Sequence, residues 1–364
     1  MLMLAAALSL AAAQQVQPFS LPSADGYVLT GQADAPEGRS RGVVILVAGT
    51  GAFDRDVSFG RTGTPRDRLF ADLSVRLNAR GLTAVRFDQR GVRHGVPPIE
   101  VVDAAASPGV TPENLSADVG ALYEWTRSDP GLNATCVVFF AHSEGAAHVA
   151  GVARAGAPEP ALVIGMGAPL ESKVAALRWQ MSGRDADSLA MMDADDDGVI
   201  TNDEVRANWM NTPSAVFEML APFLHPTGAW TQADLDLLRS NQAAAYEQAK
   251  ITALAMGDAD PYPSAAAPAF SGRWWKSCFT DEEPLAAQFA RWRSPMILHY
   301  GERDSQVREN RQRAAAEGVL PDGQAVFVSH PGRGHSLGRE SLLGPIEEAI
   351  ADRIADEAAA ACPA

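Results

Sequence analysis

The sequence predicts an α/β protein in which a mainly parallel sheet is covered by helices. Strand-like and helix-like segments alternate along most of the chain, as they do where helical crossovers join parallel strands. The strand-like segments are mostly continuous apolar runs, which is typical of strands buried on both faces. One of them leads directly into an Ala-His-Ser-Glu-Gly pentapeptide at residues 141–145, a small-x-Ser-x-Gly turn that reverses a strand into a helix.

Seven segments have the apolar, β-branched and aromatic content expected of strands in this sheet. They are Tyr27–Gly31, Val43–Val47, Thr83–Phe87, Cys136–Phe140, Leu162–Gly165, Met296–Tyr300 and Ala325–Ser329. Amphipathic helices are expected between them. Thr64 and Pro65 would begin one helix as N-cap and first-turn proline, Thr111 and Pro112 would begin another, and a last helix would bury isoleucines from Ile346 onward.

The alternation breaks in residues 169–293, where no convincing strand is predicted, and no internal repeat is found in the chain. Six tryptophans lie in this segment or at its edge: Trp179, Trp209, Trp230, Trp274, Trp275 and Trp292. A helical insertion between the sixth and seventh core strands would lie above the strand C-terminal ends, where ligands bind in open α/β sheets. We therefore expect a helical cap whose tryptophans pack its own core, or alternatively line an apolar substrate pocket.

Composition narrows the classes of protein. At 364 residues and 46% hydrophobic the chain can bury a large core, and a net charge of −15 argues against nucleic acid or anionic membranes as partners. Residues 1–13 have the apolar run and Ala-x-Ala end of a secretory signal without a basic start, and are too short to span a bilayer. We expect a periplasmic or secreted protein without stable membrane insertion; its oligomeric state stays open.

Three cysteines do not make a disulfide framework. Cys136 lies in an expected strand, so it is expected to be buried and inert. Cys278 and Cys362 could pair if the protein is exported, but spacing alone does not show it.

Ser143 is the expected nucleophile, because the strained turn at 141–145 exposes a serine hydroxyl that a histidine and an acid must activate. Asp304 follows an expected strand, and His335 lies in a glycine-rich loop after the last strand. The order Ser, Asp, His is that of α/β-hydrolases. The rival bases and the rival acid are His142, His299, His330 and Glu302.

An oxyanion on the substrate needs backbone N–H donors. Glu144 should supply one, with its side chain unassigned, and the glycine-rich loop after the second expected strand should supply another from Thr50 or, as second choice, Gly51. A plain glycine-rich connection is the alternative for that loop. Asp54–Asp56 and Asp88–Gly91 follow expected core strands, on the face of the sheet where the site should lie. They could position the substrate, but we favour a structural role in which they form ion pairs that hold the loops together.

Residues 193–204 match the twelve-residue EF-hand pattern. The candidate Ca²⁺ ligands are Asp193, Asp195, Asp197, the Val199 carbonyl, Thr201 through a water, and a bidentate Glu204. Helical segments at 185–192 and 203–210 would flank the loop. Only one copy is visible although EF-hands usually pair, which favours weak binding. A structural role in an extracellular setting would tolerate weak binding, and whether Ca²⁺ regulates activity or only stabilises the cap stays open. An acidic loop without metal is the alternative.

Five segments together resemble the α/β-hydrolase superfamily, most closely exported bacterial esterase-like members with a serine-peptidase-like or dienelactone-hydrolase-like core. They are Val43–Asp56, Gly81–Gly91, Val137–Gly145, Ile297–Asp304 and Pro331–His335. The resemblance covers residues 20–168 and 294–364 and implies an eight-stranded, mostly parallel sheet flanked by helices. Ala48 stands where the family often has a histidine before its oxyanion loop.

The resemblance implies Ser143, His335 and Asp304 as a catalytic triad, with backbone donors near Thr50 and Glu144. The expected activity is hydrolysis of a small-molecule carboxylic ester through an acyl-enzyme, with Ca²⁺ organising the cap and no cofactor needed for the chemistry. A peptidase, thioesterase or lactonase would use the same triad. A non-catalytic, calcium-responsive binding protein on a hydrolase scaffold is the alternative from another class.

Overall fold

The computed structural model describes residues 15–58, 63–97, 100–132, 134–209, 219–264, 267–338 and 344–363. Eight strands form one sheet in the order β1-β2-β4-β3-β5-β6-β11-β12. They are β1 (Gln15–Pro22), β2 (Val28–Ala35), β3 (Val43–Val47), β4 (Thr83–Phe87), β5 (Val137–His142), β6 (Leu162–Met166), β11 (Met296–Gly301) and β12 (Ala325–His330). Strands β4, β3, β5, β6, β11 and β12 pair parallel to one another, and β2 pairs antiparallel with both β1 and β4, so the predicted eight-stranded, mostly parallel sheet is confirmed.

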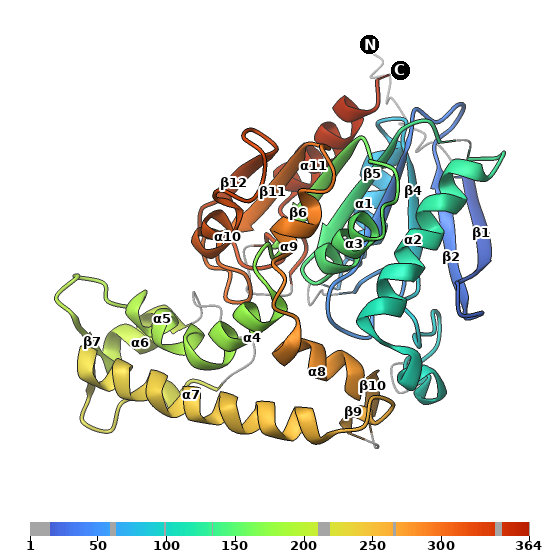
Figure 1. The fold of residues 1–364 in the computed structure, drawn as a ribbon. Helices are drawn as coiled ribbons and strands as arrows, with labels where there is room; N and C mark the ends of the chain where they lie inside the picture. The colour runs from blue at the N-terminus through green and yellow to red at the C-terminus, as the bar shows by residue number, and fades with distance from the viewer. Residues whose placement is uncertain are drawn as a thin grey trace, which may run out of the picture.

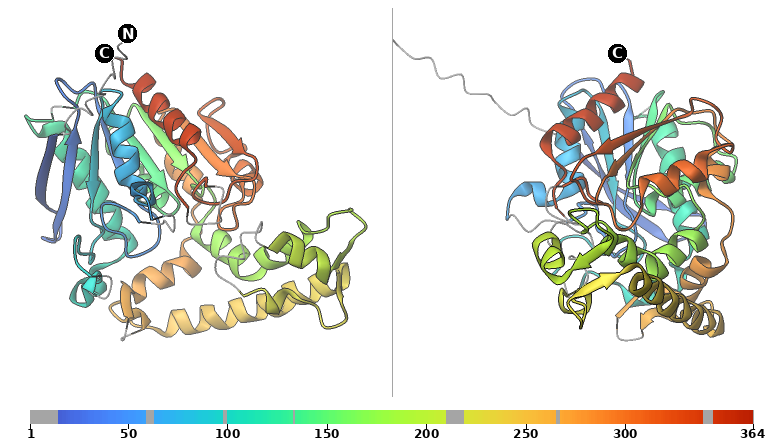
Figure 2. Two further views of the ribbon diagram at one scale, coloured as in Figure 1. Left: turned by 180° about the vertical axis from the view of Figure 1, so that it is seen from behind. Right: turned by 90° about the vertical axis from the view of Figure 1, so that its left-hand side faces the viewer.

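Helices cover both faces of the sheet because its strands are apolar on both sides. One face packs against α2 (Pro112–Ser128), α3 (Gly145–Arg154) and α9 (Leu285–Phe289), and the other against α1 (Leu69–Asn78) and α11 (Glu348–Ala361). Figure 1 shows the first of these layers in front, and the reverse view in Figure 2 brings α1 and α11 forward. Neighbouring residues of β5 divide between the two cores, since Phe139 faces one and Phe140 the other.

Two local predictions need correction. Sequence reading missed β1, whose side chains are mostly exposed and which contains two prolines, because an antiparallel edge strand lacks the apolar run of a buried one. Thr64 and Pro65 do begin a helix, but it is the short 3₁₀ helix Pro65–Asp67, the Thr64 side chain makes no capping hydrogen bond, and α1 begins only at Leu69. Thr111 does cap α2, by accepting a hydrogen bond from the Asn114 N–H at 3.1 Å.

The cap inserted between β6 and β11 lies across the carboxyl ends of the parallel strands (Figure 1). Its helices are α4 (Lys173–Ser182), α5 (Arg184–Ala190), α6 (Asn202–Asn208), α7 (Gln232–Ala255) and α8 (Gly272–Thr280). The expectation of no strand here is wrong, because four short ones occur: β7 (Val199–Thr201), β8 (Ala229–Thr231), β9 (Pro261–Ser264) and β10 (Ala267–Ser271). Strands of three to five residues are too short for a period-2 pattern to be recognised.

A disulfide joins Cys136, just before β5, to Cys362, just after α11, with 5.7 Å between the Cα atoms. The proposed pairing of Cys278 with Cys362 is therefore wrong, as is the inert role given to Cys136; Cys278 is buried and free. The two partners are 226 residues apart, and only the return of α11 to the start of β5 brings them together. The bond attaches the last helix to the strand that carries the candidate nucleophile.

The expected signal segment, residues 1–13, and Met210 of an expected helix lie outside the described residues. Within the part of the chain that is described, no helix combines the length and apolar character that a membrane span requires.

Candidate active site

Ser143 occupies a strained turn between β5 and α3. Its φ is 54°, a left-handed conformation that a residue with a side chain rarely adopts, and its N–H donates to the Met166 carbonyl at 2.9 Å. Gly145 makes the turn possible: a Cβ there would lie 2.4 Å from the carbonyl oxygen of Val47. The strand-to-helix reversal predicted from the pentapeptide is therefore present, and it presents the serine side chain to a cavity.

Asp304 and His335 lie together beside this turn. The Asp304 Oδ2 is 2.7 Å from the His335 Nδ1, and both side chains are almost completely buried. The other carboxylate oxygen, Oδ1, accepts hydrogen bonds from the N–H groups of Gln306 at 2.7 Å and Val307 at 2.9 Å. A carboxylate in this position accepts a hydrogen bond from the Nδ1–H of a neutral imidazole, which leaves Nε2 unprotonated and able to act as a base.

A cavity of about 520 Å³ lies between the core and the cap at this site. Ser143 and His335 both line it from the core, and Leu177, Trp274 and Trp275 line it from the cap. The expected base and nucleophile therefore face one apolar space under the cap. Two of the six tryptophans of the expected cap segment, Trp274 and Trp275, line the cavity, as one alternative predicted. Trp209 and Trp230 instead pack a separate core within the cap, as the other alternative predicted.

Three of the four rival residues are engaged elsewhere. His299 Nδ1 lies 3.0 Å from His330 Nε2, and its Nε2 lies 2.8 Å from the Glu357 carboxylate. Glu302 accepts the N–H of Gly332 at 2.8 Å. His142 lies beside the His335 ring, at 5.0 Å between centroids, and burial first and His335 second hold the pKa of His142 well below its usual value. These contacts favour Asp304 and His335 over their rivals.

The loop after β3 passes directly over the nucleophile. A Cβ at Gly49 would lie 2.6 Å from the Ser143 Cβ, so only glycine permits this approach. Gln89 braces the loop by donating to the Gly49 carbonyl at 2.8 Å. Thr50 and Gly51 follow at once, and Glu144 stands at the N-terminus of α3, where N–H groups lack partners within the helix. All three expected donor residues thus belong to segments beside Ser143, and their role as donors stays a prediction.

The charged residues after β3 and β4 form ion pairs, which was the favoured interpretation. Arg55 donates to Asp88 at 2.6 Å, and Arg90 bridges Asp25 at 2.7 Å and Asp118 at 2.6 Å. These pairs hold the loops that carry the site.

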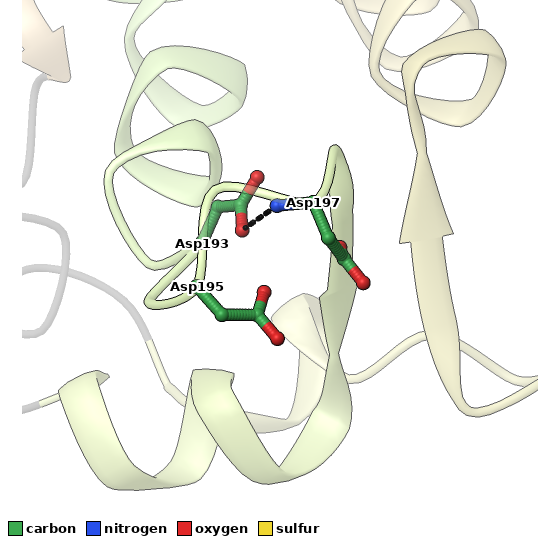
Figure 3. Close-up of side chains that lie close together, drawn as sticks. All are labelled: Asp193, Asp195 and Asp197. Carbon is green, nitrogen blue, oxygen red and sulfur yellow. Dashed lines mark hydrogen bonds between the residues drawn. The ribbon is translucent and has the colours of Figure 1, made fainter.

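The acidic loop of the cap brings three carboxylates together (Figure 3). Asp193, Asp195 and Asp197 each offer an oxygen, all within 4.8 Å of one another. Asp193 also accepts the N–H groups of Asp197 at 3.2 Å and Gly198 at 2.9 Å, which curls the loop around them. Glu204 turns its carboxylate to the N–H groups of Ala194 at 2.9 Å and Thr201 at 2.8 Å. The all-oxygen donor set fits a hard cation such as Ca²⁺.

Sequence analysis missed a partner for this loop. The pattern Gly-x-apolar-Thr-x-x-acid occurs at residues 198–204 and again at 228–234. The expectation of no internal repeat is therefore wrong. Both glycines have positive φ, both threonines cap the following helix with the acid, and β7 pairs antiparallel with β8, Ile200 opposite Trp230. The second copy escaped notice because its early positions carry no acids. Where the first loop has aspartates, it has Phe223, His225 and Thr227.

No protein-family model matches the chain, and no curated protein matches its sequence. Solved structures do match. A lipase in an open form has a TM-score of 0.56 at 15% identity, covering 95% of this chain and 99% of that chain. The alpha/beta hydrolase GrgF from Penicillium sp. sh18 has a TM-score of 0.51 at 15% identity, covering 96% of this chain and 99% of that chain. The esterase EaEST from Exiguobacterium antarcticum has a TM-score of 0.51 at 11% identity, covering 94% of this chain and 99% of that chain. The protein has the α/β-hydrolase fold.

Proposed function

We propose that this protein is a serine hydrolase that acts on carboxylic esters of small molecules. The observation that carries the proposal is the 2.7 Å hydrogen bond between Asp304 and His335, because His335 lines the same cavity as Ser143, which is held at positive φ. Esterases and lipases are among the proteins that share the fold, which supports ester hydrolysis at the general level.

The proposed reaction uses the three side chains in turn. His335 Nε2 takes the proton of the Ser143 hydroxyl as its oxygen bonds to the ester carbonyl carbon, and N–H groups from Thr50 or Gly51 and from Glu144 hold the resulting oxyanion. The protonated imidazole gives its proton to the departing alcohol, leaving an acyl-enzyme. Water, deprotonated by the same nitrogen, then releases the acid.

Hydrolysis of p-nitrophenyl esters from acetyl to palmitoyl tests this function. A cavity of about 520 Å³ with an apolar cap wall should accept short and medium acyl chains better than palmitoyl. Turnover by the wild-type protein with such a profile would support the proposal. Folded, calcium-loaded protein that hydrolyses no ester would contradict it and direct the search to peptide and thioester substrates first, and then to a binding role.

We further propose that the loop at 193–204 binds Ca²⁺ through Asp193, Asp195, Asp197, the Val199 carbonyl, Thr201 through a water, and Glu204. Residues 193–204 include six acids and no base, so a divalent cation would relieve their repulsion. The loop shares an apolar core with β8 and α7, which includes Ile200 and Trp230. An ion there would stabilise the cap and take no part in the chemistry.

Calcium is expected to stabilise the wild-type protein by about 1–3 kcal/mol at millimolar concentrations, the range for a weak extracellular site. Terbium, as a calcium substitute, should show luminescence sensitised by the tryptophans of the same core. Asp195→Ala should abolish both effects. The matched control is Asp203→Ala, since this exposed carboxylate in the same loop is outside the ligand set. Equal responses of the two variants would contradict the assignment.

We also propose that the protein is exported, as its disulfide supports, because such bonds persist mainly in oxidising compartments. Protein purified without reductant and then denatured should show one reactive thiol, from Cys278. Reduction should lower its stability by about 4 kcal/mol. The variant Cys136→Ser/Cys362→Ser, as control, should be equally destabilised and insensitive to reductant. Three reactive thiols in native material would contradict the proposal.

A further inference from the structure

The side chain of Glu144, the residue after the nucleophile, turns away from solvent into a set of three donors. Its Oε2 accepts the Thr50 hydroxyl at 2.6 Å. Its Oε1 accepts the Lys173 ammonium at 2.7 Å and the Trp274 indole N–H at 2.9 Å. Both members of the ion pair are largely buried, at 11% exposure for Glu144 and 14% for Lys173. The catalytic chemistry proposed above uses only the backbone of Glu144 and leaves this carboxylate unexplained.

The three donors come from three separate parts of the chain. Thr50 belongs to the loop that passes over Ser143, Lys173 is the first residue of α4 where the chain enters the cap, and Trp274 lies on α8 near its exit. Lys173 also approaches the Ser277 hydroxyl of α8 at 3.3 Å, which ties the two ends of the cap to each other. One carboxylate therefore joins both candidate oxyanion segments to both ends of the cap.

Both partners of this junction carry their charge at neutral pH. Burial alone would raise the pKa of Glu144, but Lys173 and His148, with hydrogen bonds from Lys173 and Thr50, outweigh it and hold that pKa at about 2. Burial likewise opposes the charge of Lys173, and Glu144 overcomes it and raises its pKa. A buried pair of this kind is costly to break, because removal of one partner leaves the other charge uncompensated.

We infer that Glu144 is a positioning residue that couples the cap to the oxyanion hole. Its carboxylate sets the distance between the elbow and the Thr50 loop, and the Lys173 and Trp274 contacts make that distance depend on the seating of the cap. Small displacements of such donors weaken transition-state stabilisation far more than substrate binding. The inference rests on the proposed function, because it assigns a role within ester hydrolysis.

The test compares Glu144→Gln, Lys173→Met and the double variant on one p-nitrophenyl ester, with rates divided by the sites titrated with a fluorophosphonate. Each single variant should lower kcat per titrated site by about 10- to 100-fold, with KM changed less than about threefold. The double variant should lose no more than the worse single variant, because both changes remove one link. Glu247→Gln is the matched control: it breaks an exposed α4–α7 ion pair with Arg178 and should keep wild-type kcat.

Wild-type kcat per titrated site in Glu144→Gln would overturn the inference and leave the carboxylate a merely structural role. Losses that multiply in the double variant would also overturn it. If Glu144→Gln does not fold, Thr50→Val removes the exposed hydroxyl alone and should lower kcat about five- to tenfold; an unchanged kcat would overturn the inference. A wild-type protein that neither hydrolyses esters nor reacts with the fluorophosphonate overturns the proposed function as well.

Discussion

Replacing Ser143 by alanine is expected to lower kcat on the best p-nitrophenyl ester by about 10⁵-fold or more. The hydroxyl removed is the group that would bond to the acyl carbon, and the residual rate would reflect only binding and the oxyanion donors. Alanine is smaller than serine in the same turn, so the melting temperature should stay within a few degrees of the wild-type value. Steady-state kinetics and thermal unfolding measure the two quantities.

Two further variants make this result specific. His335→Ala should lose about as much activity, and the double variant no more than either, because the serine and its base act as a unit. Ser58→Ala is the matched control, since Ser58 lines the same cavity and the substitution is identical. More than a tenth of wild-type kcat in Ser143→Ala would be incompatible with the proposed nucleophile.

Asp304→Asn should lower kcat by about 10⁴-fold without changing the shape of the site. Asp304 Oδ1 accepts two backbone N–H groups, so an asparagine would keep its oxygen there and turn its NH₂ toward His335. The imidazole would then accept at Nδ1 and carry its proton on Nε2, where it cannot take the serine proton. A kcat–pH profile of the variant, compared with the wild type, measures the loss at every pH.

The control for this prediction is Glu302→Gln, because Glu302 was the rival acid and its carboxylate accepts only the backbone N–H of Gly332 among the contacts described. It should retain wild-type kcat within about threefold. If Glu302→Gln were the inactive variant and Asp304→Asn the active one, the assignment of the acid would be wrong.

Much of the fold and the place of the candidate triad could be predicted because their signals are local. Five consecutive residues after a buried strand indicate Ser143, and the position of Asp304 directly after another buried strand indicates that residue. The parallel sheet then brings the carboxyl ends of β5 and β11 to one edge, where the two residues lie. That these side chains act together in catalysis stays a prediction until the variants are measured.

The features that escaped prediction depend on contacts between distant segments. Cys136 and Cys362 have nothing in their neighbouring residues to mark them as partners. The same holds for Glu144 and Lys173, since an isolated lysine at the start of a helix usually has its charge in solvent. The partner of the acidic loop was missed for a different reason: ligand positions define the EF-hand pattern, and the second copy, at residues 228–234, preserves only the glycine, the apolar residue, the threonine and the final acid.

Identification of the residue that reacts with a fluorophosphonate tests the central claim most directly. Wild-type protein would be labelled and digested, and the modified peptide sequenced by mass spectrometry. The proposed mechanism predicts one phosphonyl group, on Ser143, with no labelling of Ser143→Ala. Labelling at another residue, or no reaction of folded wild-type protein with calcium present, would contradict the assignment of this chain as a serine hydrolase acting through Ser143.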